Sequence, residues 1–182
     1  MRVTAGKYKG RKLIDRPFDH IRPTADMVKQ AIFNKLAFVT NGAKVLDLFC
    51  GTGALGIEAL SRGASMVVMA DLNPKSVMLT KDNLKLLSTP LEAKVLQGDY
   101  KTVLEKLKGE KFDIIILDPP YKSGVYEDCL QKIHELDLLS NDGIIVCEHN
   151  KEDKFDFSLF EIESEKIYGI KCVSYLLKRE EI

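Results

Sequence analysis

The sequence lacks the features that mark membrane, disulfide-bonded and metal-stapled proteins. No apolar run approaches the roughly 18–20 residues that cross a bilayer, and the N-terminal residues include no apolar stretch typical of a signal peptide. The four cysteines stand far apart and form no Cys-x-x-Cys pair, so their spacing favours neither a zinc site nor a thioredoxin motif. We expect free thiols in a cytoplasmic protein without membrane contact.

The chain also lacks internal repeats, low-complexity tracts and an overall charge. Its 182 residues carry 27 basic and 27 acidic side chains and are 45% hydrophobic. This composition is ordinary for a globular protein and excludes collagen-like, coiled-coil and disordered chains. A chain of this length fits one domain, which buries roughly 70% of its unfolded surface and needs no disulfide or metal to fold.

The charges are unevenly distributed along the chain. Residues 1–35 hold nine basic and three acidic side chains, which leaves 18 basic and 24 acidic ones for the remainder. Such asymmetry is typical of a chain end that meets a polyanion. A solvated basic hairpin without a partner explains the charge alone equally well.

From residue 44 onward, short apolar runs alternate with amphipathic segments, which predicts an α/β fold with a parallel sheet covered on both faces. A final pair of runs around Gly169 predicts a hairpin that makes the last of seven strands antiparallel. The expected strands are 45–49, 66–70, 93–96, 112–117, 143–147, 159–167 and 171–177, and the expected helices are 54–61, 74–87, 100–107 and 125–136.

A different piece precedes this core. Two short runs, 2–5 and 11–14, flank a basic glycine-containing turn and predict a two-stranded β-ribbon. Thr24 can cap a helix that runs to about Ala37. We therefore divide the chain into a basic ribbon and helix, residues 1–40, and a core domain, residues 41–182.

The first motif of the core runs from Asp47 to Gly53 and joins a strand to a helix. Its glycines allow backbone N–H groups to approach a ligand at a helix N-terminus. Gly51, Gly53 and Gly56, with Asp71 twenty residues after the first, match the dinucleotide fingerprint, so a nicotinamide enzyme is one alternative. The Asp47 carboxylate instead suits a ligand with an ammonium group, such as the methionyl end of S-adenosylmethionine.

Two later strands also end in acids. Asp71 is placed to accept from ribose hydroxyls, and Asp99 from an adenine amine, with Leu72 and Tyr100 packing on the purine. Each acid alone would more often cap the helix that follows it. The expected cofactor contacts are Asp47, Phe49, Cys50, Gly51, Gly53, Asp71, Leu72, Asp99 and Tyr100.

The third motif is Asp118-Pro119-Pro120-Tyr121, directly after a buried strand. The prolines cannot donate to a central ladder and therefore end the strand. With the Asp118 carboxylate, their carbonyls form an acceptor array for an NH₂ group, and Tyr121 offers a face on which a base can stack. A proline loop that merely terminates the strand is the alternative explanation.

Together the motifs resemble those of class I S-adenosylmethionine-dependent methyltransferases, whose Rossmann-like sheet has seven strands and an antiparallel last strand. The D-P-P-Y segment resembles the [DN]PP[YFW] motif of amino-group methyltransferases acting on nucleobases or glutamine amides. G-K-x-x-G-R-x-L at 6–13, R-P-T at 22–24 and A-I-F-N-K-L at 31–36 are similar to the RsmD family. That family comprises bacterial 16S rRNA guanine-N2 methyltransferases, which act on guanine 966 of the reference numbering.

This resemblance implies roles for the remaining residues. Asp118 and the Pro119 carbonyl would hold the guanine N2, Tyr121 would stack on the base, and no metal is needed. The partner would be 16S rRNA, within the small ribosomal subunit or an assembly particle, and the protein a monomer. The residues expected to bind RNA are Arg2, Lys7, Lys9, Arg11, Lys12, Arg22 and Thr24.

Other functions share some of these features. A DNA adenine-N6 or protein glutamine methyltransferase would share the core motifs, whereas a nicotinamide oxidoreductase rests on the glycine spacing alone. A non-catalytic RNA-binding assembly factor would keep the basic ribbon without using the D-P-P-Y segment. Stabilisation by S-adenosylhomocysteine and not by NAD distinguishes the methyltransferases from the oxidoreductase.

Overall fold

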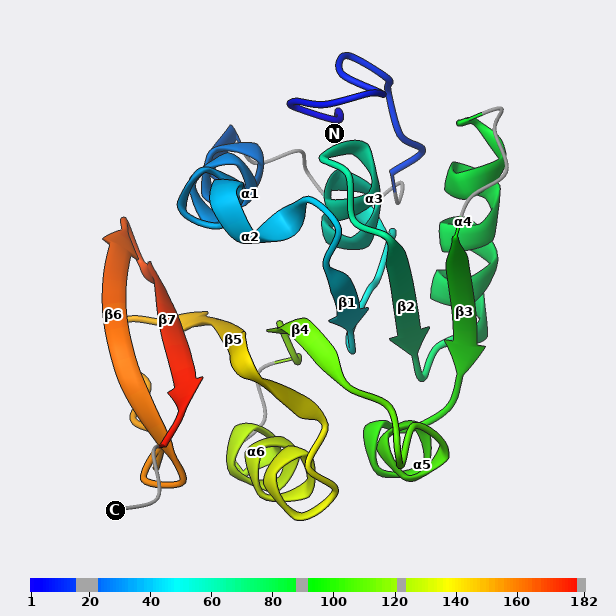
Figure 1. The fold of residues 1–182 in the computed structure, drawn as a ribbon. Helices are drawn as coiled ribbons and strands as arrows, with labels where there is room; N and C mark the ends of the chain where they lie inside the picture. Colours follow the sequence, from blue (N-terminus) through cyan, green and yellow to red (C-terminus); the bar gives the residue numbers. More distant parts are fainter. Residues whose placement is uncertain (16–22, 88–91, 121–123, 180–182) are drawn as a thin grey trace.

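A computed structural model describes residues 1–15, 23–87, 92–120 and 124–179 (Figure 1). The sheet consists of β1 Lys44–Asp47, β2 Met66–Asp71, β3 Ala93–Gln97, β4 Phe112–Leu117, β5 Leu139–Asn150, β6 Phe160–Tyr168 and β7 Lys171–Lys178. The helices are α1 Pro23–Lys35, α2 Ala37–Thr40, α3 Ala54–Ser61, α4 Pro74–Lys85, α5 Tyr100–Lys106 and α6 Val125–Glu135.

The seven strands form one sheet in the order β3-β2-β1-β4-β5-β7-β6. Strands β1 to β5 run parallel, whereas β7 is antiparallel to both β5 and β6. The sequence prediction of an α/β fold with a mostly parallel sheet and an antiparallel last strand is therefore confirmed. The hairpin prediction also holds, and its second strand inserts between β5 and β6.

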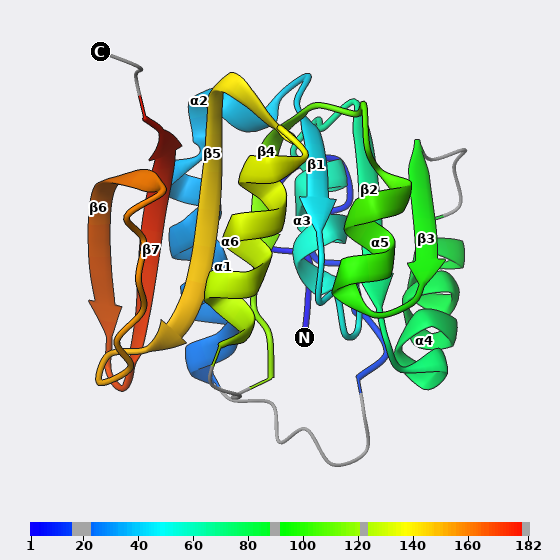
Figure 2. The ribbon, with the colours of Figure 1, turned by 90° about the horizontal axis from the view of Figure 1, so that it is seen from below.

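Helices cover both faces of the sheet (Figure 2). Helices α5 and α6 pack on one face, with β-strand residues such as Leu46 and Ile115 in the same apolar cluster. Helices α1 and α3 pack on the other face, against alternate strand residues such as Val45 and Ile114. Because successive side chains of a strand point to opposite faces, both sets are buried, and the central strands are apolar throughout.

Strand β5 is longer than the sequence predicts. The apolar run ends at Cys147, but the strand continues to Asn150 because β7 pairs with it there, with His149 opposite Cys172 and Asn150 opposite Lys171. An antiparallel neighbour can extend a strand into polar sequence, since the ladder bonds are made by the backbone. Periodicity in a single chain segment gives no sign of such pairing.

The N-terminal ribbon is present in a minimal form. One antiparallel bridge joins Arg2 to Lys12, and Val3 N donates to Arg11 O at 3.0 Å. Val3 and Leu13 are 2% exposed and pack with residues of α3 and the segment after α4. The ribbon thus lies against the α3 side of the sheet (Figure 1).

A buried carboxylate joins the ribbon to α3. Glu58 accepts from Thr4 N at 2.9 Å, from Thr4 Oγ1 at 2.6 Å and from Ala5 N at 3.1 Å. Its charge is paired with Arg62, at 2.8 Å, and with Lys29, at 3.6 Å. Glu58 is fully buried, so these contacts replace the water that the carboxylate loses.

Candidate active site

The sheet reverses its winding between β1 and β4. The chain runs outward from β1 through β2 to β3, then returns to place β4 on the other side of β1. Ligands of open α/β sheets bind at such a switch point, outside the carboxyl ends of the strands. Asp47 ends β1 and Asp118 follows β4, so the two motifs expected to bind the cofactor and the target flank this point.

The glycine loop after β1 is held in a conformation that needs its glycines. Gly51 and Gly53 have φ of 55° and 80°, in the left-handed region that favours glycine. A Cβ on Gly53 would lie 2.8 Å from the Thr80 side chain, and one on Gly56 would lie 2.5 Å from Met69 Sδ. The loop is therefore packed tightly against α4, and the α3 helix that follows it is packed tightly against the sheet.

Asp47 is a buried carboxylate at the start of this loop. It is 1% exposed and accepts from Gly56 N at 3.1 Å. Burial raises the pKa of Asp47 to about 7, and the nearby negative charge of Asp71 adds to the rise, although the Gly56 hydrogen bond opposes it. A carboxylate in this state gains strongly from a cationic partner.

Asp71 supports the loop from the neighbouring strand. Its Oδ2 accepts from Gly51 N at 2.9 Å, and its Oδ1 accepts from Asn73 N at 2.8 Å. Both oxygens keep further lone pairs, and the side chain is only half-buried. Leu72 beside it is 69% exposed, which leaves an apolar surface at the strand end for a ligand to cover.

Asp99, which follows β3, caps helix α5, as the alternative interpretation of this acid predicts. Asp99 accepts from Lys101 N at 3.0 Å, from Thr102 N at 3.1 Å and from Thr102 Oγ1 at 2.6 Å. The hydrogen bonds from Thr102 and Lys101 hold the pKa of Asp99 below its usual value. Tyr100 donates to Asp128 at 2.9 Å, and its ring centroid lies 6.0 Å from that of Phe49. An adenine contact by Asp99 stays a prediction.

Asp118 lies in a row of charged residues at the ends of adjacent strands. Burial raises the pKa of Asp118 to about 8; the negative charges of Glu148 and Asp47 add to the rise, and Lys171 opposes it. Lys171 pairs with Glu148 at 3.4 Å. The ionised form of Asp118 is therefore disfavoured in the ligand-free protein.

The rest of the D-P-P-Y segment is only partly described. Pro119 is buried and Pro120 is exposed, so the segment passes from the interior to the surface after β4. Tyr121 lies outside the described residues, as does Arg22 of the expected RNA contacts. Thr24 belongs to α1.

Two residues of this region were missed by sequence reasoning. Thr80 donates to Gly51 O at 3.1 Å and lies 3.5 Å from Cys50 Sγ, while Asn83 donates to Thr52 O at 2.9 Å. Both are fully buried polar residues on α4, where sequence patterning assigns polar side chains to solvent. Their i, i+3 spacing puts them on one face of the helix, and this spacing is the sequence feature that could have indicated a shared buried role.

The expected RNA contacts of the ribbon gather on one surface. Arg2, Lys7, Lys9, Arg11 and Lys12 are all exposed, and the last four line one open hollow together with Tyr8 and Leu86. Arg2 also donates to Gly10 O at 3.1 Å, which stiffens the turn. By contrast, Lys29 of α1 is 4% exposed, and its ammonium group pairs with Asp26 and Glu58 inside the protein.

The fold and this site define a class I methyltransferase. The seven strands have the order described above. The glycine loop follows β1 and the Asp-Pro-Pro segment follows β4, so both lie at the carboxyl ends of neighbouring strands. In the part of the chain that the structure describes, no helix is long and apolar enough to cross a membrane.

Comparison with known proteins identifies the family. Residues 1–177 match the family model described as "Conserved hypothetical protein 95". Bacillus subtilis YlbH is 37% identical over 98% of this chain and its own full length. The Escherichia coli protein named "Ribosomal RNA small subunit methyltransferase D" is 32% identical, over 84% of this chain and 76% of its own. The solved structure of Escherichia coli yhhF superposes with a TM-score of 0.86 at 29% identity, covering 100% of this chain and 99% of that one.

The chain belongs to this family, the RsmD family of S-adenosylmethionine-dependent methyltransferases. The resemblance found in the sequence is thereby confirmed, and S-adenosylmethionine is the cofactor. The residues at the site fit it, because the buried Asp47 carboxylate suits its ammonium group and the exposed Leu72 suits its adenine. The nicotinamide alternative falls with this assignment.

We predict that Asp71→Ala weakens S-adenosylmethionine binding by about 1.5–3 kcal/mol, because a hydrogen bond from a hydroxyl to a carboxylate is charge-assisted. Calorimetric titration measures the change. Asp82→Ala is the control, since Asp82 is an exposed carboxylate of α4 that pairs only with Lys85 among the interactions of the described residues. Unchanged affinity in the Asp71 variant would remove Asp71 from the ribose site.

Proposed function

We propose that this protein transfers a methyl group from S-adenosylmethionine to the exocyclic N2 of guanine 966 in 16S rRNA. The observation that carries the proposal is the Asp118-Pro119 acceptor pair beside Asp47 at the switch point, in a chain whose ribbon exposes four clustered basic residues. Relatives from Escherichia coli and Haemophilus influenzae, 32% and 33% identical, are named as small subunit rRNA methyltransferases, which supports ribosomal RNA as the substrate.

The chemistry of a guanine amine explains the acceptors. The N2 lone pair is delocalised into the ring, so the amine is a poor nucleophile. Acceptors that hold its two hydrogens favour a more pyramidal nitrogen and stabilise the positive charge that develops during transfer. The ionised Asp118 carboxylate and the Pro119 carbonyl supply these acceptors, and they also orient N2 for in-line attack.

S-adenosylmethionine supplies the methyl group on a positively charged sulfur. Asp47 would hold its ammonium group and Asp71 its ribose, which fixes the methyl carbon relative to Asp118. Transfer would break the bond from the methyl carbon to sulfur and release S-adenosylhomocysteine. N2 would then carry the methyl group, both of its hydrogens and a positive charge, and it would become neutral by losing one proton to Asp118 or to water. Ionised Asp118 is competent both to accept the hydrogen bond and to take that proton.

The ribbon would bind the RNA backbone. Its exposed lysines and arginines contact phosphates without reading sequence, so they position the RNA and make the affinity depend on salt. A guanine N2 inside a helix is hard to reach, so the target base would be in a loop or extruded, and Tyr121 would stack on it. Residues 1–40 form this RNA-binding part and residues 41–182 the methyltransferase domain.

The substrate is 16S rRNA within the small ribosomal subunit or an assembly particle, in the cytoplasm, and the protein acts as a monomer. Labelled methyl transfer to small subunits that lack the modification, followed by identification of the product nucleoside, tests the proposal. N2-methylguanosine supports it, whereas N6-methyladenosine or an unmodified particle contradicts it.

We predict that replacing Lys7, Lys9, Arg11 and Lys12 with alanine weakens RNA binding and flattens its dependence on salt. Each lost phosphate contact should reduce the slope of log affinity against log salt by about 0.7–0.9. The affinity for S-adenosylmethionine should not change, since these residues lie on the ribbon and not at the strand ends.

A matched control removes charge elsewhere. Lys106→Ala with Lys108→Ala neutralises two exposed lysines at the end of α5, on the opposite face of the sheet from the ribbon. This pair should leave the salt slope unchanged. An unchanged slope in the ribbon variant would mean that the ribbon is a solvated face without an RNA partner.

A further inference from the structure

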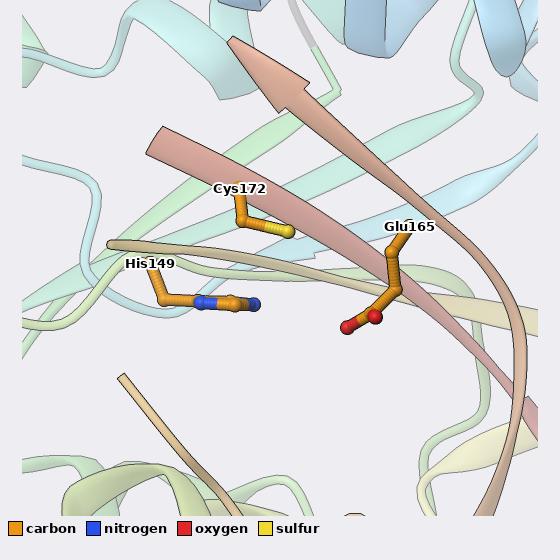
Figure 3. Close-up of side chains that lie close together, drawn as sticks. All are labelled: His149, Glu165 and Cys172. Atoms are coloured by element: carbon orange, nitrogen blue, oxygen red, sulfur yellow. The ribbon is translucent and has the colours of Figure 1, made fainter. Parts of the chain in front are cut away.

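Three strands bring together three metal-binding side chains to which the proposed methyl transfer assigns no role. His149 of β5 stands opposite Cys172 of β7, and Glu165 of β6 is paired with the residue two positions further on, Ser174. The imidazole, thiol and carboxylate have ligand atoms that all lie within 4.8 Å of one another. Figure 3 shows the imidazole edge, the sulfur and the carboxylate pointing into one space.

Hydrogen bonding fixes the tautomer of the histidine. Nδ1 of His149 lies 2.8 Å from the carbonyl oxygen of Asn150, which can only accept, so Nδ1 carries a proton. Metal-bound histidines usually make this same contact through the nitrogen that does not bind the metal. In the neutral ring, Nε2 is then a lone-pair donor that faces the cluster.

The Ser174 hydroxyl lies between the imidazole and the carboxylate of the cluster. Ser174 Oγ lies 2.7 Å from His149 Nε2 and 2.7 Å from Glu165 Oε1. Its single O–H can donate to only one of these two atoms, and Glu165 is exposed, so water can also reach the carboxylate. A cation placed among the three groups would take both lone pairs.

We propose that His149 Nε2, Cys172 Sγ and Glu165 form a zinc site. Nitrogen, thiolate sulfur and carboxylate oxygen are the donors that Zn²⁺ prefers, whereas Mg²⁺ and Ca²⁺ require oxygen ligands. Zinc bond lengths of about 2.0–2.3 Å place tetrahedral ligands about 3.3–3.8 Å apart, so the cluster needs to contract by about 1 Å. Water or the Ser174 hydroxyl completes the tetrahedron, and the Cys172 proton passes to solvent on binding.

The surroundings suit a site that links strands. His149 is 4% exposed and Cys172 is 5% exposed, while Glu165 faces solvent and gives the ion an entry path. The His149 ring packs against Phe155, at 5.1 Å between centroids, and near Tyr126 of α6, at 6.2 Å. Bound zinc would tie the β6–β7 hairpin to β5. The cysteine spacing in the sequence does not predict this site, because strand register creates it.

Cobalt titration of the untagged full-length protein, under reducing conditions, tests the proposal. One equivalent of Co²⁺ should produce a thiolate-to-cobalt charge-transfer band and tetrahedral d–d absorption, and one equivalent of Zn²⁺ should abolish both. Cys172→Ser should lose the charge-transfer band. Glu165→Gln and His149→Gln should each lower zinc affinity by at least about 10–100-fold, the loss that even an outer-shell partner costs.

The controls separate the site from unfolding and from other ligands. Cys129→Ala removes a fully buried thiol of α6, and His134→Gln an exposed imidazole of the same helix; both should keep the spectrum and the zinc affinity. Glu165 is exposed, so Glu165→Gln keeps the fold even where Cys172→Ser does not. A bound cobalt without a thiolate band, a band that survives Cys172→Ser, or zinc affinity unchanged in Glu165→Gln would overturn the proposal.

Discussion

Replacing Asp118 with alanine should lower the single-turnover rate of methyl transfer by about 10²–10³-fold, the usual cost of losing a preorganised electrostatic partner. The affinity for S-adenosylmethionine should stay nearly constant, because the Asp118 contact to the target amine strengthens only as the amine attacks. The carboxylate follows β4 directly and is fixed by a strand that is fully buried at Ile116 and Leu117. Rapid mixing of labelled cofactor with the RNA substrate measures the rate.

The control for this variant is Asp142→Ala, since Asp142 is an exposed acid near the opposite end of β5. It should transfer methyl groups at the wild-type rate. An Asp118→Ala enzyme as fast as the wild type would exclude Asp118 from the chemistry. Loss of cofactor binding in that variant would instead assign the carboxylate to the cofactor site.

The raised pKa of Asp118 gives this prediction a pH signature. In the proposed mechanism the ionised carboxylate is the active form, so the rate should rise as the pH passes through about 8. Glu148→Gln removes a like charge that disfavours ionisation, so it should move the rise to lower pH. In Asp118→Asn the rise should disappear, and a rise that persists would assign the titration to another group.

Replacing Glu58 with alanine should reduce the free energy of unfolding by about 3–5 kcal/mol, because it breaks a buried ion pair and leaves Lys29, among the described residues, with Asp26 at 3.5 Å as its one carboxylate partner. Thr4 and Ala5 also lose the acceptor for their N–H groups. Burial alone would raise the pKa of Glu58, but hydrogen bonds from Thr4 and Arg62 and the charge of Lys29 hold it below its usual value. Its contribution to stability is therefore present at neutral pH and is lost as the pH falls through this lowered pKa.

Urea unfolding measures this change, and Glu105→Ala is the matched control. Glu105 is an exposed helix carboxylate that pairs with Lys132 at 2.9 Å, and such surface pairs contribute about 0–1 kcal/mol. A loss in the Glu58 variant as small as that of the control would show that water replaces the carboxylate and that the apolar contacts and the hydrogen bonds to Ser61 are sufficient to hold the ribbon on α3.

The sequence was sufficient to predict the architecture, because the hydrophobic pattern of each core segment agrees with the burial of that segment in the folded sheet. The run Phe112–Leu117 is a strand buried on both faces, and Asp47 and Asp118 end neighbouring strands as the motifs predict. Asp99 is an example of an ambiguous local pattern, since an acid before a helix is compatible with a helix cap and with a ligand contact. In the structure Asp99 caps α5. Whether it also contacts adenine depends on a ligand and not on the chain.

What the sequence could not predict depends on contacts between distant segments. Glu58 lies in the otherwise apolar segment 54–60, where a single acid gives no sign of its partners Thr4 and Lys29. His149 and Cys172 become neighbours only through the register of β5 and β7. No spacing rule covers either case, because the partners are fixed by how strands and the ribbon meet in space.

The insertion of β7 between β5 and β6 has a consequence for synthesis on the ribosome. The β6 segment, 160–168, is translated before 171–178, the one strand that pairs with it among the described residues, so it cannot join the sheet when it emerges. Until β7 has been translated and pairs with β5, the free edge of β5 presents unpaired N–H and C=O groups, which are a template for pairing with other chains. A nascent chain that stalls between residues 150 and 170 should therefore be aggregation-prone, whereas one released after residue 178 closes its own edge.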